Sequence, residues 1–106
     1  MALQTQITAR HVELNDHVRQ YAESRAQKLE RFYDGIVSAH VILGEKNSPA
    51  SPKQAEINID VYKKRLSAED VADTYEEAIN LCVDHLRRQL EKYKAQLRDK
   101  NQDVHR

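Results

Sequence analysis

Hydrophobic residues recur every three or four positions along the last third of the chain, from residue 73 to about residue 100. This segment contains neither glycine nor proline. At about 100° per residue its apolar positions form one stripe, which predicts an amphipathic helix of about six or seven turns. Asp73 followed by Glu76 is a suitable N-terminal capping pair. The stripe consists of Tyr75, Ile79, Cys82, Val83, Leu86, Leu90, Tyr93 and Leu97.

A shorter amphipathic helix is predicted from residue 16 to about residue 33. Asn15 precedes it, and asparagine is a favoured N-cap residue. Gly35 follows its last apolar position and is expected to end the helix in a left-handed conformation. The predicted buried stripe consists of Val18, Ala22, Ala26, Leu29 and Tyr33.

Four other segments have the patterns of β-strands. Apolar and polar residues alternate over residues 3–10 and 55–62, which predicts strands with one buried and one wet face. Residues 36–45 are rich in β-branched and apolar side chains, as in a largely buried strand. Residues 65–71 form a fourth, weaker strand pattern.

Two connections between these strands are visible in the sequence. Residues 47–52, NSPASP, contain both prolines of the chain and predict a loop. Lys63 and Lys64 separate the last two strand patterns, so a tight turn is expected there. Neither residue is a glycine or an asparagine, the usual residues of such turns.

The predicted order of elements is therefore β-α-β-β-β-α. Short connections predict an antiparallel meander for the last three strands, and the helix after the first strand predicts a parallel pairing. One apolar stripe per helix and one apolar sheet face predict an α+β fold of two layers, a four-stranded sheet with both helices packed on one face. Residues 1–100 are expected to form one domain and residues 101–106 a polar tail that frays.

Composition limits the possible functions of this domain. Seventeen basic and seventeen acidic residues cancel, so a nucleic-acid site has to be a local patch rather than a general positive charge. Cys82 has no partner for an intramolecular disulfide, which fits a reducing cytoplasm. The sequence shows no signal peptide and no run of apolar residues long enough to span a membrane.

Charge is sorted along and around both predicted helices. The long helix is acidic from residue 73 to residue 84 and basic beyond it, and the helix dipole accounts for part of this order. On each helix, three basic residues also lie together on one flank. They are spread over about 60° of the long helix and about 120° of the short one. If the helices lie side by side, these flanks can face each other across a shallow groove, but the pattern does not fix which flanks meet. The two sets are His85, Arg88 and Lys92, and Arg25, Lys28 and Arg31.

The sequence contains little that indicates catalysis. Cys82 lies on a core stripe, unlike a nucleophilic cysteine, and Gly35 and Gly44 are too far apart for a phosphate-binding loop. The histidines lie on different predicted elements without metal-ligand spacing. Enzymatic activity, a metal, a cofactor and a small-molecule substrate are therefore not expected. The five histidines are His11, His17, His40, His85 and His105.

Tyr62 is followed by three basic residues, Lys63, Lys64 and Arg65, on the predicted wet face of a strand. An aromatic ring beside three cations can contact RNA. An exposed strand end explains the same pattern equally well, because lysines at a sheet edge discourage unwanted strand pairing.

Five segments resemble the ribosome hibernation promoting factors and the related ribosome-associated inhibitor. The resemblance runs through nearly the whole chain in the same order. No single segment is enough to identify the family, but the five segments together are specific for it. The segments are TARHVELND, KLERFYD, IVSAHVIL, YEEAIN and DHLRRQLEKYK.

The resemblance implies a β-α-β-β-β-α domain whose two helices present a basic surface to the small ribosomal subunit. Such a protein binds small-subunit rRNA in the channel of the mRNA and the A- and P-site tRNAs, and thereby blocks translation in stationary phase without catalysis. It is expected to be cytoplasmic, without a cofactor, and monomeric when free. The residues that match the family's basic positions are Arg25, Lys28, Arg31, His85, Arg88 and Lys92.

Two roles within the family remain open. Short promoting factors act with ribosome modulation factor to pair ribosomes, whereas the inhibitor carries a longer tail that opposes pairing. The tail is of intermediate length and the dimerisation domain of long members is not in this sequence, which favours the promoting role. Ala9 stands where the family often has glycine, and His85 replaces a usual lysine, which would make that contact depend on pH.

Two other classes of protein are compatible with the pattern. One is a module like the double-stranded RNA-binding domain, whose α-β-β-β-α order lacks the first strand. Its basic clusters are expected in loops, whereas those of this chain are on helices. The other is a protein-interaction domain in which the helix charges only solvate the surface.

Overall fold

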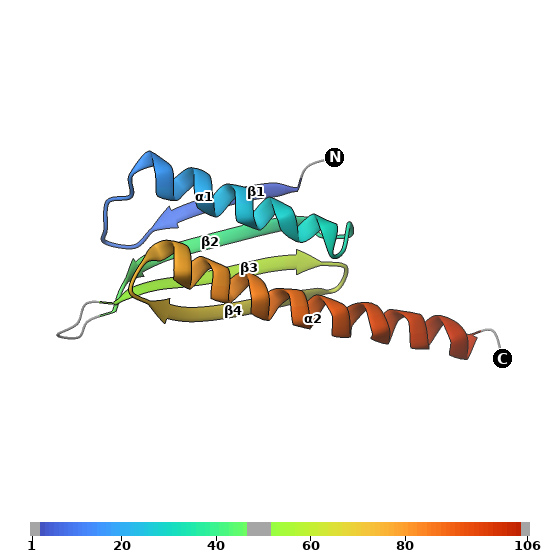
Figure 1. Ribbon diagram of the computed structural model, residues 1–106. Helices are drawn as coiled ribbons and strands as arrows, with labels where there is room; N and C mark the ends of the chain where they lie inside the picture. The colour runs from blue at the N-terminus through green and yellow to red at the C-terminus, as the bar shows by residue number, and fades with distance from the viewer. Residues whose placement is uncertain (1–2, 47–51, 105–106) are drawn as a thin grey trace.

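The computed structural model describes residues 3–46 and 52–104, with side chains up to residue 97. The observed order confirms the predicted β-α-β-β-β-α fold, with a short 3₁₀ helix after the first helix (Figure 1). The elements are β1 (Gln4–Ala9), α1 (Asp16–Gln27), η1 (Lys28–Arg31), β2 (Ser38–Glu45), β3 (Lys53–Val61), β4 (Lys64–Ala72) and α2 (Tyr75–Val104).

The four strands form one mixed sheet in the order β1-β2-β3-β4. β1 pairs with β2 in parallel, while β2–β3 and β3–β4 are antiparallel, as predicted. Ile57 lies at the centre, opposite Val41 of β2 and Ala68 of β4. β4 is nine residues long, so the weak pattern of residues 65–71 belongs to a full strand.

Both helices lie on the same face of the sheet (Figure 1). α1 packs on β1 and β2, and α2 packs on β3 and β4. Alternate residues of β2 and β3, together with Leu66 and Ala68 of β4, are buried beneath the helices. Each fully buried aliphatic side chain contributes about 1.5–3 kcal/mol to folding. The largest fully buried side chains include Val41, Leu43, Ile57 and Ile59 of the sheet and Leu29, Ile79, Leu86 and Leu90 of the helices.

The first helix begins as predicted but ends differently. The Asn15 side chain accepts a hydrogen bond of 2.8 Å from the backbone N–H of Val18, which confirms the N-cap. The α-helix stops at Gln27 and tightens into η1, which ends where the backbone N–H of Phe32 donates to the Leu29 carbonyl. Gly35 does not have a positive φ, so its predicted role as a left-handed cap is wrong.

Gly35 is instead required by close packing. A Cβ atom at this position would lie 2.5–2.7 Å from atoms of the Tyr33 ring. This ring also meets Tyr93 of α2 edge-on, with 5.5 Å between the ring centroids. The absence of a side chain at Gly35 therefore lets the chain pass beside the aromatic contact between Tyr33 and α2.

The second helix is capped by Thr74 rather than by the predicted Asp73. The Thr74 hydroxyl accepts a hydrogen bond of 3.1 Å from the backbone N–H of Glu77. α2 continues helically through residues 101–104, so the helix extends a few residues beyond its predicted end near residue 100. Its thirty residues are about 45 Å long, whereas the nine residues of β4 span about 30 Å. α2 therefore extends beyond the sheet (Figure 1).

The tight turn between β3 and β4 is formed by Tyr62 and Lys63, one residue earlier than predicted. Val61 pairs with Lys64 and closes the turn. Lys63 has a positive φ of 61°, a conformation that glycine or asparagine adopts more readily. The loop predicted over residues 47–52 lies, except for Pro52, outside the described residues. Among the helices that the structure describes, none is long and apolar enough to cross a membrane.

Candidate nucleic-acid interface

One flank of α2 lies over the outer strand, β4. The His85 ring nitrogen Nε2 is 3.0 Å from the Asp70 carboxylate, and the Gln89 side-chain amide donates a hydrogen bond of 2.8 Å to the Ser67 carbonyl. These contacts turn the flank that carries His85 toward β4. Asp70 is thus a local acidic partner for the first of the predicted binding residues on this helix.

Arg88 also has an acidic partner, whereas Lys92 does not. The Arg88 guanidinium is 3.0 Å from the Asp84 carboxylate, and Arg87 contacts the same carboxylate at 3.0 Å. Hydrogen bonding by Arg87 and the charge of Arg88 lower the pKa of Asp84, so Asp84 remains ionised between the two arginines. No ion pair among the described side chains involves Lys92, which is exposed.

The cations of the first helical segment differ in exposure. Lys28 and Arg31 are exposed and form no ion pair with another described side chain. Arg25 is half-buried, and its Nε atom is buried without a hydrogen-bond partner in the described part of the protein. Arg25 therefore contributes as much to packing as to surface charge, and Lys28 and Arg31 are the freer cations.

Lys94, which does not lie on the predicted basic flank of α2, is a further cation close to η1. Its Nζ atom donates a hydrogen bond of 2.9 Å to the Phe32 carbonyl. Lys94 and Arg31 line one hollow, together with two acidic residues, Glu30 and Asp34. The sequence did show Lys94 in the basic half of the long helix. Only the end of η1 reveals that it lies beside Arg31.

The two predicted basic flanks do not face each other across one groove. Where α1 and α2 meet, His17 lies 3.5 Å from Glu76, and the Tyr21 hydroxyl donates a hydrogen bond of 2.8 Å to the Asn80 side chain. The side of α2 next to α1 is therefore acidic and polar near its N-terminus. Cations line two hollows beside α2 instead. Lys92 shares one with Lys64 at the start of β4, and Lys94 shares the other with Arg31.

The open face of the sheet has a different organisation. The Asp60 carboxylate accepts hydrogen bonds from Ser38 at 2.9 Å and from Arg65 at 2.8 Å. Arg65, followed by Ser38, lowers the pKa of Asp60, and Asp60 in turn raises the pKa of Arg65. The Ser67 hydroxyl donates to the Asn58 side chain at 2.6 Å. These polar groups are paired with one another.

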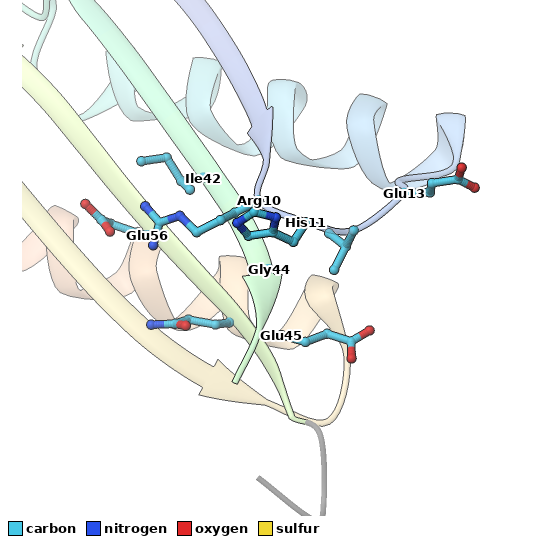
Figure 2. Close-up of a pocket in the computed structure, with 9 residues that line it drawn as sticks. Arg10, His11, Glu13, Ile42, Gly44, Glu45 and Glu56 are labelled. Atoms are coloured by element: carbon cyan, nitrogen blue, oxygen red, sulfur yellow. The ribbon is translucent and has the colours of Figure 1, made fainter. Parts of the chain in front are cut away.

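A hollow of about 360 Å³ lies on this open face, near the end of β1 (Figure 2). Arg10 and His11 line it together with three carboxylates, those of Glu13, Glu45 and Glu56. Three acids repel phosphate more than two basic groups attract it. In the described residues no group of three or more potential metal ligands is present either. The candidate nucleic-acid interface is therefore the helix side.

Cys82 lies between the two layers. Its thiol is fully buried and donates a hydrogen bond of 3.3 Å to the Ala55 carbonyl of β3. Burial raises the pKa of the Cys82 thiol to about 12. The thiolate form that a nucleophile needs is therefore suppressed.

The fold and its charges define a class: a two-layer α+β domain with free cations on its helix side and self-paired polar groups on its sheet side. A sequence model of the family described as sigma 54 modulation protein / S30EA ribosomal protein matches residues 5–98. The chain belongs to this family, which agrees with the resemblance seen in its segments.

Individual relatives support the same assignment. The ribosome hibernation promotion factor of Staphylococcus aureus (strain COL) is 30% identical over 90 residues, which are 85% of this chain and 47% of that protein. The chain thus spans about half the length of this curated relative. The names of the family and of this relative describe ribosome-associated factors rather than enzymes.

Two solved structures have the same fold. The N-terminal domain of Thermus thermophilus Protein Y is 28% identical, with a TM-score of 0.72, and covers 88% of this chain and 99% of that one. A ribosomal subunit interface protein from Coxiella burnetii has a TM-score of 0.75 over the same shares of both chains. At 24% identity, the latter similarity concerns the fold alone.

Proposed function

We propose that this protein is a ribosome hibernation factor. It binds small-subunit rRNA through its helix side, in the channel that otherwise holds the mRNA and the A- and P-site tRNAs. Occupancy of that channel blocks translation in stationary phase, and no bond is made or broken. The observation that carries the proposal is the family match over residues 5–98. A ribosomal target places the action of the protein in the cytoplasm.

The contacts rank the six proposed rRNA-binding residues. Lys28, Arg31 and Lys92 have no acidic partner among the described side chains, so they are free to bind phosphates. At Arg88 and His85 an RNA phosphate has to compete with Asp84 and Asp70. Arg25 is expected to contribute least, because it is half-buried.

This arrangement favours contacts with phosphates over contacts with bases. Lysine and arginine side chains that neutralise phosphates release counterions, so binding weakens steeply as the salt concentration rises. Such contacts position a protein on the nucleic acid but carry little sequence information. The shape of the rRNA channel is therefore expected to determine where this protein binds.

Co-sedimentation with purified small subunits at low and moderate salt tests the proposal. The wild-type protein is expected to bind at low salt and to dissociate as salt is added. Arg88→Glu with Lys92→Glu should abolish binding without loss of the fold. Arg10→Glu with Lys46→Glu is the matched control, because it changes the net charge equally at exposed positions outside the helices. Absence of wild-type binding at low salt would contradict the proposal.

Within this function we favour the role of promoting ribosome dimers together with ribosome modulation factor. The alternative is an inhibitor that keeps single ribosomes inactive and opposes pairing. Sucrose gradients of whole ribosomes with both factors distinguish the two roles. A shift into dimers supports promotion, whereas fewer dimers than with ribosome modulation factor alone would support the inhibitor. The free protein is proposed to be a monomer, which size-exclusion chromatography with light scattering tests.

A further inference from the structure

The turn between β3 and β4 presents an aromatic ring at the end of the sheet. Tyr62 is 69% exposed, directly after the buried Val61 at the end of β3. Lys63 places its Nζ atom 5.4 Å from the centroid of the Tyr62 ring. An exposed aromatic ring beside a cation provides a stacking surface for an unpaired base, because every nucleobase has an aromatic face.

The backbone that carries this ring is fixed by the core. The Tyr62 carbonyl accepts a hydrogen bond of 2.9 Å from the hydroxyl of Tyr93 on α2. Tyr93 is itself buried and packs edge-on against Tyr33. The position of Tyr62 therefore depends on main-chain contacts and not on its own side chain. Replacing the ring removes the stacking surface but leaves the turn anchored.

Free lysines surround the same turn. Lys64 and Lys92 line one hollow together with Arg65 and Tyr93. Arg65 is occupied by Asp60 at 2.8 Å, whereas no ion pair between described side chains involves Lys64 or Lys92. Lys92 also belongs to the proposed phosphate-binding set. The hollow thus connects that set on α2 with the turn.

Residue 63 of the turn is a lysine, although its backbone conformation favours asparagine or glycine. Lys63 has a φ of 61°, which asparagine and glycine tolerate better than lysine. Strained residues are found at functional sites more often than elsewhere. The side chain of Lys63, exposed and placed over the Tyr62 ring, gives a reason to retain lysine here.

We propose that Tyr62 stacks on an unpaired base of the small-subunit RNA while Lys63, Lys64 and Lys92 bind the phosphates beside it. The juxtaposition of an anchored, exposed ring with three lysines carries this inference. It rests on the proposed function and adds to it a contact with a base, whereas the other proposed contacts are with phosphates.

The first test compares Tyr62→Ala with Tyr62→Phe in equilibrium binding to purified small subunits. The alanine variant should bind about 5- to 100-fold more weakly, the range expected for loss of one stacked base. The phenylalanine variant keeps the ring and should bind within about two-fold of wild type, a change that is small against the stacking effect. Circular dichroism and thermal melting verify that both variants fold. If the alanine variant binds as tightly as the wild type, this inference is wrong but the proposed function stands. If the wild type does not bind at all, the proposed function itself is contradicted.

Chemical probing of the rRNA identifies the partner of the ring. One unpaired base should be protected by the wild-type and phenylalanine proteins and exposed with the alanine variant. If the alanine variant binds more weakly but the reactivity of every base stays the same, Tyr62 packs on a ribosomal protein and the stacking proposal is wrong.

Lys63→Asn tests the lysine separately. Asparagine suits the left-handed backbone, so this variant should be more stable than wild type but bind about five-fold more weakly, as expected for loss of one phosphate contact near 0.1 M salt. Lys46→Asn is the control, because it removes a lysine near the opposite end of the sheet. Equal binding by the two variants would overturn the role of Lys63.

Discussion

The helix side and the open sheet side of this protein contain similar residue types but pair them differently. On the sheet side, Asp60 binds both Ser38 and Arg65, so the charges and hydroxyls satisfy one another. On the helix side, Lys28 and Lys92 form no ion pair with other described side chains. A neutral chain can therefore present a basic surface to a polyanion, because Lys28 and Lys92 on the helix side keep charges that Arg65 on the sheet side loses to Asp60.

After the loss of binding expected for the double variant of Arg88 and Lys92, the largest effect is expected from reversing two free cations of η1. Lys28→Glu with Arg31→Glu removes two proposed phosphate contacts. Near 0.1 M salt this should weaken binding to small subunits by about 25- to 60-fold, and the slope of log K against log salt should become shallower by about 1.5–2. Fluorescence anisotropy of labelled protein over a salt series measures both quantities. An unchanged slope would remove η1 from the interface.

A smaller effect is expected from removing the acidic partner of Arg88. Asp84→Asn frees Arg88 from its carboxylate partner and should strengthen binding about five-fold near 0.1 M salt, with no gain near 1 M salt. Glu45→Gln is the matched control, because it frees Lys53 on the sheet side by the same change of charge. Equal gains from both variants would show that net charge, rather than the helix side, determines affinity.

The fold was predictable from the sequence because each element depends on its own periodicity. Alternation over residues 55–62 identified the central strand, and the three- and four-residue spacing beyond residue 73 identified α2. The ends of the helices were less predictable. η1 ends through a bond to the Leu29 carbonyl, and Gly35 is needed by the Tyr33 ring, which are tertiary effects without a local signal.

The candidate site was predictable only in part. Helical geometry grouped His85, Arg88 and Lys92 on one flank, but it could not show that Asp70 of β4 lies against His85. Neither could it place Lys94 beside Arg31, since that contact needs the end of η1 and the middle of α2 in register. Sequence spacing identifies cations on one element, whereas acidic partners on other elements determine which cations are free.

A still smaller effect is expected on the sheet side, where a substitution should change the stability of the protein but not its binding to small subunits. Asn58 accepts a hydrogen bond from Ser67 at 2.6 Å and donates one to Glu56 at 3.0 Å. Asn58→Ala should lower the free energy of unfolding by about 1–2 kcal/mol, because it removes two hydrogen bonds with a net value of about 0.5–1.5 kcal/mol each. Binding to small subunits should not change. Urea unfolding and sedimentation measure the two properties, and a loss of binding by the folded variant would place the open face in the interface.

The smallest effect is expected at Cys82, which lies between the two sides. Its thiol is fully buried and its pKa is raised to about 12 by burial, so iodoacetamide at pH 8 should not modify the folded protein over hours. A raised pKa stabilises the fold below the ordinary thiol range, and this contribution is lost as the pH rises toward 12. Modification should therefore accelerate at alkaline pH or in urea. Mass spectrometry measures the rate, with the unfolded protein as the control. Rapid modification at pH 8 would mean that α2 opens away from β3, and the two sides would then not be separated by a closed core.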